Sequence, residues 1–168
     1  PDDVAKIGDL INIELQRLYI FRNTTEFFAD RWTLQCLRNL KHFMSRGRDL
    51  ESLRDALRGS SAVVVGAGPS VDEGIEWIKA QAPRPVVICA FKALKALNAA
   101  GIEPDLVICL DPAQHARHMV GVDTARIPGV VVEFGMSSEV IERAEGALFP
   151  YVGNLVSSEL ANCLGLKG

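Results

Sequence analysis

From residue 60 onward, the chain alternates short apolar runs, rich in β-branched residues, with segments of helical periodicity. The strand-like runs are Ala62–Val65, Val86–Ala90, Leu106–Leu110, Val130–Phe134 and Leu148–Val152. The helical segments are Val71–Ala82, Lys92–Ala100, Ser138–Ala144 and Val156–Leu164. Apolar strands that alternate with helices form parallel sheets with both faces covered. This pattern predicts an α/β fold: a Rossmann-like parallel sheet with helices on both faces.

The first 58 residues have a different texture, with no proline after Pro1 and only two glycines. Two groups of apolar residues recur there at helical spacing, one within 10–19 and one within 27–44. A third, short helix is expected at Leu50–Leu57, ended by Gly59. We therefore predict a helical lead-in at 1–58 and a nucleotide-binding α/β domain at 59–168. The aromatic residues of the lead-in predict contact with another domain or protomer.

Composition narrows the functional classes. The 168 residues are 48% hydrophobic and carry a net charge of −3 without a basic block, which argues against nucleic-acid binding. The longest uninterrupted apolar run, Val86–Phe91, is too short for a membrane span. The first residues show no signal-peptide pattern. They also lack an initiating methionine, so we expect the chain to be a piece of a longer protein.

Four cysteines occur, and none forms a C-x-x-C pair. Cys89 and Cys109 fall in predicted strands, where a free thiol acts as a small buried apolar group. A disulfide or metal role is therefore disfavoured, and a reducing, cytoplasmic setting is expected.

The first predicted strand runs into the turn Gly66-Ala67-Gly68-Pro69-Ser70, which precedes a helix. Glycines let a ligand approach the backbone, and the free amides of a helix N-terminus favour an anion such as phosphate. The turn is only a partial G-x-G-x-x-G, because Val71 takes the third glycine position, and it is no P-loop. A second interpretation is a capping box, in which Ser70 and Glu73 satisfy the helix amides without any ligand.

Other polar residues follow the later strands, whose carboxyl ends should meet along one rim. Lys92 could neutralise a phosphate or be a solvated lysine. Asp111 could hold a ribose hydroxyl, a metal or a proton, or be a turn residue before Pro112. The last of these groups is Glu133-Phe134-Gly135, where Glu133 is either a rim residue or the polar end of an edge strand.

Four further polar residues are His115, His118, Asp72 and Asp105. His115 and His118 could form an acid/base or metal cluster with Asp111, or be two exposed histidines. Asp72 places negative charge where a phosphate would bind, so it either points away or binds through a metal. Asp105, after Pro104, is expected to serve turn chemistry.

The ordered segments VVVGAGPSVD, ALKALNAAGIEPDLVICLDP and a final GNLVSS before a helix resemble the bacterial motility accessory factor (Maf) family of flagellin glycosylation proteins. The central domain of that family is similar to MptE-type hydroxymethylpterin diphosphokinase. The resemblance covers Leu57 to Gly165, with a helical lead-in before it. The family normally continues beyond the point where this chain stops, which agrees with a truncated C-terminal end.

The resemblance implies a glycosyltransferase core that moves a nonulosonic acid, of the pseudaminic or legionaminic type, from a CMP-sugar to Ser or Thr of flagellin. The partners would be flagellin and the nucleotide-sugar. The CMP-sugar is a substrate, no cofactor is specified, and Mg²⁺ enters only under the kinase alternative given below. By this resemblance Gly66, Gly68, Pro69 and Ser70 would hold the cytidine nucleotide, and Asp111 would line the same pocket. Ala67, Asp72 and Lys92 are further nucleotide-binding candidates because of their place at the strand ends. Asp111 and His115 are the candidates for catalytic groups.

Two alternatives stay open at this point. One is a diphosphokinase that transfers diphosphate from ATP to a hydroxymethylpterin, with Mg²⁺ held by Asp72 and Asp111. The segment ICLDP is closer to the flagellar branch than to the archaeal pterin kinases, for which an Asp-Leu-Asp run is expected. The other alternative is a non-catalytic module that binds a nucleotide or a partner protein.

Overall fold

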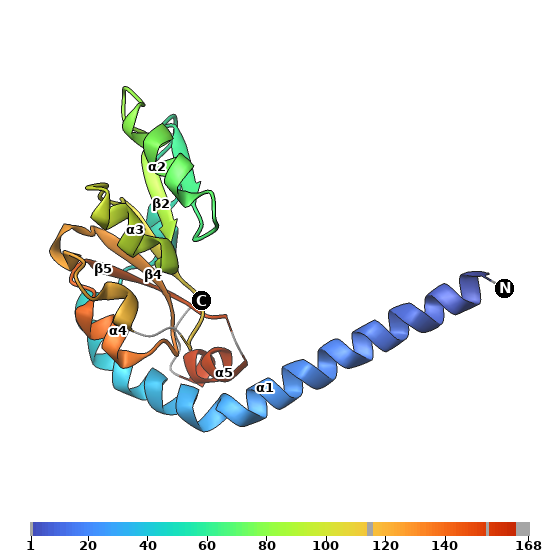
Figure 1. Ribbon diagram of the computed structural model, residues 1–168. Helices are drawn as coiled ribbons and strands as arrows, with labels where there is room; N and C mark the ends of the chain where they lie inside the picture. Colours follow the sequence, from blue (N-terminus) through green and yellow to red (C-terminus); the bar gives the residue numbers. More distant parts are fainter. Residues whose placement is uncertain (1, 114–115, 154, 164–168) are drawn as a thin grey trace.

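A five-stranded, fully parallel sheet forms the centre of the protein in the computed structural model, which describes residues 2–113, 116–153 and 155–163 (Figure 1). The strands are β1 (Ala62–Val65), β2 (Val86–Ala90), β3 (Leu106–Cys109), β4 (Gly129–Glu133) and β5 (Ala147–Tyr151). The α-helices are α1 (Asp2–Arg46), α2 (Val71–Lys79), α3 (Leu94–Ala99), α4 (Ser138–Arg143) and α5 (Leu155–Cys163). Short 3₁₀ helices are η1 (Leu50–Leu53), η2 (Phe91–Ala93), η3 (Ala116–Met119) and η4 (Thr124–Arg126). The predicted α/β class is confirmed, and each strand limit lies within one residue of the limit expected from the apolar runs.

The strand order is β1-β2-β3-β4-β5, the order of the sequence. Right-handed crossovers in such an order put the connecting helices on one face of the sheet. Every second strand residue points to that face and joins one apolar core with residues of α2, α3 and α4. The strand residues of this core are Val65, Val87, Cys89, Val107, Cys109, Val130, Val132 and Leu148.

The second face is covered around β4 and β5 only. All five residues of β4 are buried, and the side chain of Glu133, which points away from the main core, hydrogen-bonds to Ser157 of α5. Helices therefore lie on both faces, as predicted. Over β1–β3 the second face is only partly covered, and Val64 is 75% exposed.

The lead-in differs from the prediction of separate helices, because one continuous helix, α1, spans both apolar groups. Its second half packs beside β5, α4 and α5. Asn39 Nδ2 donates to the carbonyls of Phe134 (3.3 Å) and Met136 (2.8 Å). At its end, Arg46 donates to two carbonyls of the last turn of α4, those of Ile141 and Ala144. These contacts fix α1 across the carboxyl end of β4.

The rest of the lead-in is short. The predicted third helix is a single 3₁₀ turn, η1. Asp49 caps the amide of its second residue, because Asp49 Oδ1 accepts from Glu51 N at 2.9 Å. Across the described ranges, no helix combines the length and apolarity that a bilayer span requires.

Candidate functional site

The carboxyl ends of β1, β2 and β3 border one open cavity of about 530 Å³. Its lining comes from the residues just after these strands: Ala67, Ala90, Phe91, Lys92, Ile108, Cys109, Leu110 and Asp111. Three of the predicted site residues, Ala67, Lys92 and Asp111, therefore meet around one space. The strand order follows the sequence throughout the described sheet, so the cavity lies along a straight edge and not at a point where the strand order reverses.

The glycine turn after β1 stands open to solvent. A Cβ placed on Gly66 or Gly68 would meet no atom within 4 Å, and neither residue has a positive φ. Packing and backbone conformation within this chain therefore do not require glycine at these positions. Pro69 and Ser70 are exposed as well, so the whole turn is accessible to a ligand.

The helix that follows the turn begins without a side-chain cap. Ser70 is the N-cap residue of α2, but its hydroxyl makes no cap hydrogen bond, so the capping-box interpretation is wrong. The amides of Val71 and Gly74 donate to Gly68 O and Ser70 O, both at 3.1 Å. The amides between them, of residues 72 and 73, find no acceptor among the described residues.

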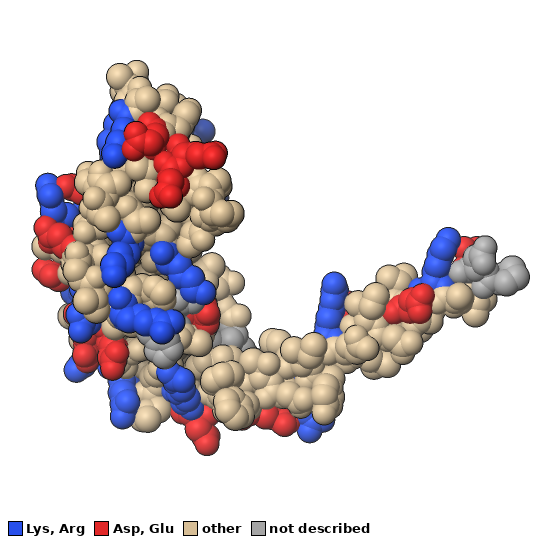
Figure 2. All heavy atoms as spheres, viewed as in Figure 1, with Lys and Arg blue, Asp and Glu red and all other residues tan. Residues whose placement is uncertain are grey.

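Charges near the turn have both signs. Lys92 is exposed at the end of β2 and lies on the cavity, where it forms no ion pair with a described residue. Asp72 and Glu73 occupy the first turn of α2 and are exposed; Figure 2 shows carboxylates gathered over this helix. Because Asp72 does not line the cavity, the described geometry does not pair it with Asp111.

Asp111 has a structural role in addition to its place on the cavity. Its Oδ1 accepts a hydrogen bond from Ala113 N at 2.9 Å, which is the local turn contact that an Asp-Pro sequence favours. Its charge and, first of all, burial raise the pKa of the neighbouring Cys109 thiol. The turn interpretation of Asp111 is therefore confirmed, and its role in binding stays a prediction.

The two histidines were predicted as a pair. His115 lies outside the described residues. His118 is half-buried in η3, where its ring meets Phe91 edge-on with a centroid distance of 5.8 Å, so it is not simply solvent-exposed. Across the described part of the chain, no three His, Cys, Asp or Glu side chains gather as metal ligands would.

Glu133 does not join this cavity. It is 1% exposed and its Oε2 accepts from Gly135 N at 2.5 Å. Burial is the main cause that raises the pKa of the Glu133 carboxyl, while hydrogen bonds from Ser157 and from backbone amides lower it. The expectation that Glu133-Phe134-Gly135 shares the rim with the glycine turn is wrong, because α1 and α5 cover the end of β4. β4 is also not an edge strand.

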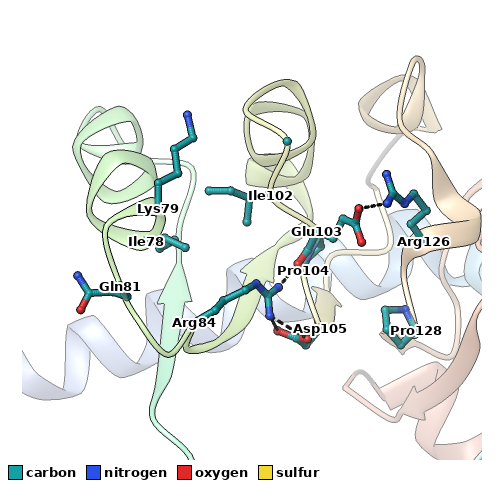
Figure 3. Close-up of a pocket in the computed structure, with 11 residues that line it drawn as sticks. Ile78, Lys79, Gln81, Arg84, Ile102, Glu103, Pro104, Asp105, Arg126 and Pro128 are labelled. Carbon is teal, nitrogen blue, oxygen red and sulfur yellow. Dashed lines mark hydrogen bonds and ion pairs between the residues drawn. The ribbon is translucent and has the colours of Figure 1, made fainter.

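A second cavity, of about 390 Å³, lies at the opposite, amino-terminal edge of the strands (Figure 3). Figure 3 shows Arg84 directed at Asp105 and Arg126 directed at Glu103, with N–O distances of 2.9 and 2.5 Å. Asp105 Oδ2 also accepts from Val87 N at 2.7 Å. These charges pair with one another and tie the loop before β3 to β2.

The segment Gly101–Asp105 (GIEPD) lines this cavity, and its contacts show why some of these residue types occur there. Gly101 has φ +75° and ends α3, while Ile102 N returns to Leu97 O at 2.9 Å, a helix stop that favours glycine. Pro104 is buried, and Asp105 has the contacts given above. In GIEPD, glycine and aspartate therefore serve folding, in line with the predicted turn chemistry of Asp105.

Sequence reasoning missed the apolar part of the carboxyl-edge cavity. Phe91, Ile108 and Leu110 line it, and each lies within two residues of the end of a predicted strand. The position at the strand ends was the available signal, but a binding role was assigned there only to the residues of the glycine turn, Asp72, Lys92 and Asp111.

The fold and this edge define a parallel α/β domain with a glycine turn at the carboxyl end of its first strand. The chain belongs to the 6-hydroxymethylpterin diphosphokinase MptE-like family, whose sequence model matches residues 34–165. This match confirms the MptE-type resemblance inferred from the motifs.

Two individual proteins are also similar. A Treponema pallidum (strain Nichols) protein described as uncharacterized is 25% identical over 122 residues, which cover 71% of this chain and 57% of that protein. The chain thus spans little more than half the length of this relative. A solved structure of Maf glycosyltransferase from Magnetospirillum magneticum AMB-1 is 26% identical with a TM-score of 0.47, and covers 56% of this chain and 16% of that one.

Proposed function

We propose that this chain is the nucleotide-binding core of a glycosyltransferase that transfers a nonulosonic acid from a CMP-sugar to a Ser or Thr hydroxyl of flagellin. One observation carries the proposal: the glycine turn is open to solvent beside a cavity that holds Lys92 and Asp111. The motif resemblance supplies the identity of donor and acceptor. A cytoplasmic location is part of the proposal, and the four free cysteines support it.

The chemistry requires a group that stabilises departing CMP. When the bond from the anomeric carbon to the phosphate oxygen breaks, negative charge accumulates on the phosphate. The unpartnered amides in the first turn of α2 and the ammonium group of Lys92 are the donors that this chain offers. Amides and an ammonium group can stabilise this charge without a metal ion.

The acceptor hydroxyl must lose a proton as it attacks the anomeric carbon. Asp111 is the candidate base within the described residues, because its carboxylate lines the cavity. The contact of its Oδ1 with Ala113 N fixes the carboxylate at the end of β3. Asp111→Asn is expected to retain the turn and to abolish transfer, measured with CMP-sugar and flagellin in the full-length protein.

Nucleotide binding is tested by thermal unfolding with CMP in the absence of metal. We expect CMP to raise the Tm of the wild-type chain, since a ligand that binds only the folded state stabilises it. Lys92→Gln should weaken CMP binding by about tenfold, the effect of losing one charge-assisted contact. Lys95→Gln is the matched control, because Lys95 is exposed three residues away on α3. A lack of response to CMP, or equal effects of both variants, would contradict the proposal.

The family match favours a second candidate, a Mg²⁺-dependent diphosphokinase acting on a hydroxymethylpterin. Asp72 and Asp111 are the carboxylates that would hold the metal, which would neutralise the transferred phosphates. The two residues do not line the same cavity, so the described geometry fits a shared ion poorly. Stabilisation by ATP only when Mg²⁺ is present would favour this candidate over the transferase.

A further inference from the structure

The cavity of about 530 Å³ at the carboxyl ends of β1, β2 and β3 is mostly apolar. The charged side chains that line it are Lys92 and Asp111, and the Cys109 thiol beside them is buried. The other lining side chains are hydrocarbon: Ala67, Ala90, Phe91, Ile108 and Leu110. A ligand held by the two charged groups therefore also meets an apolar wall.

Neighbouring strands form this wall. Ala90 of β2 pairs with Ile108 of β3. Both point away from the main core, since the adjoining residues Cys89 and Cys109 lie in that core. On this side the sheet is only partly covered, so the short side chain of Ala90 leaves Ile108 half-buried. Leu110 follows at the end of β3 and is 49% exposed. Ile108 and Leu110 therefore present aliphatic surface to a molecule that enters the cavity.

In the proposed transfer reaction, the donor sugar lies between the two charged groups of this cavity. The departing phosphate is near Lys92, and the acceptor oxygen that attacks the anomeric carbon is near Asp111. The sugar ring joins these two points, so it occupies the cavity beside Leu110, which precedes Asp111 in the chain. This placement of the sugar rests on the proposed function.

We propose that Ile108 and Leu110 are specificity-determining residues, which select a donor sugar with methyl and N-acyl substituents over one with hydroxyl groups in their place. A hydroxyl group against the aliphatic wall gives up hydrogen bonds to water and gains no partner from these side chains, which costs free energy. A methyl group at the same point gains apolar contact. One such group changes affinity in an apolar pocket by about ten- to 200-fold. The effect expected here is about tenfold, the lower end of that range, because the cavity is open to solvent.

The test is calorimetric binding of three probes to the complete 168-residue chain. The probes are CMP, CMP-N-acetylneuraminic acid and CMP-di-N-acetyllegionaminic acid. The legionaminic sugar carries an acetamido group and a methyl group where the neuraminic sugar has a hydroxyl and a hydroxymethyl group. We expect the wild type to bind the legionaminic donor about tenfold more tightly than the neuraminic one. Leu110→Asn should reduce this preference to about twofold or less and leave the Kd for CMP unchanged.

Val64→Asn is the matched control. Val64 projects from the same side of the sheet, because its neighbour Val65 lies in the main core, and it is 75% exposed without lining the cavity. This variant should keep the wild-type preference between the two donors. Leu110→Ala removes the aliphatic surface without adding a polar group, and it should also diminish the preference. Circular dichroism should show unchanged secondary structure in all three variants.

The results separate this inference from the proposed function. Equal Kd values of the two donors in the wild type, or an unchanged preference in Leu110→Asn, would overturn the inference while CMP binding supports the nucleotide site. If Leu110→Asn weakened the binding of CMP as much as that of the donors, the wall would contact the nucleoside and not the sugar, which also overturns the inference. A wild type that binds none of the three probes would contradict the proposed function and the inference with it.

Discussion

Replacing Gly68 by alanine separates a ligand-binding role from a folding role. An added Cβ meets no atom within 4 Å and φ is not positive, so the folded state incurs no steric cost. Alanine also restricts the unfolded chain, which stabilises a protein by about 0.4 to 1 kcal/mol at a compatible position. We therefore expect the free energy of unfolding of Gly68→Ala to equal or exceed that of the wild type by up to this amount.

The effect on CMP binding should have the opposite sign. The new methyl group would stand where the nucleotide approaches the backbone, and we expect at least a tenfold weaker Kd. At a CMP concentration about 100 times the wild-type Kd, the ligand stabilises the wild type by about 2.7 kcal/mol, and a tenfold weaker variant by about 1.4 kcal/mol. For a chain of this size, about 3 °C of Tm corresponds to 1 kcal/mol. The CMP-induced shift should fall from about 8 °C to about 4 °C.

The assay is urea unfolding without ligand, followed by thermal unfolding with CMP. Gly101→Ala is the control, since φ at Gly101 is +75° and a side chain there costs roughly 1 kcal/mol or more. That variant should lose stability and keep its CMP response. A Gly68→Ala variant that loses as much stability as Gly101→Ala would refute the account of the turn, and one with an unchanged CMP shift would refute the binding site.

Two further predictions concern buried titratable groups. The pKa of Glu133 is raised in the folded state, so between the ordinary pKa of 4.5 and the folded pKa the folded protein binds more protons than the unfolded one. The free energy of unfolding therefore falls as pH rises through this range. Glu133→Gln should lessen this fall in urea unfolding measured across pH, and an unchanged slope would contradict the prediction. Burial raises the pKa of Cys36 and of Cys89 to about 12, and also raises that of Cys109, so only the exposed Cys163 should react with a thiol reagent at pH 8 before unfolding. Fast reaction of a second thiol would refute this assignment.

Part of the site was within reach of the sequence because it follows from strand ends alone. In a parallel sheet the residues after neighbouring strands share one edge, so Lys92 and Asp111 meet around one cavity. The same rule failed for Glu133, because it takes no account of which helices cover the edge. Ser70 also escaped local reasoning: its capping sequence is present, yet its hydroxyl makes no cap bond.

The sequence by itself determined the elements whose signals are local. The apolar runs set the five strands, and Gly101 set the end of α3, because strand and helix limits depend on neighbours within a few residues. Only the tertiary structure decided that β4 is enclosed and that α1 is one helix with an exposed half. Burial depends on segments far apart in the chain: Asn39 reaches carbonyls 95 and 97 residues away, and no local pattern specifies such a contact.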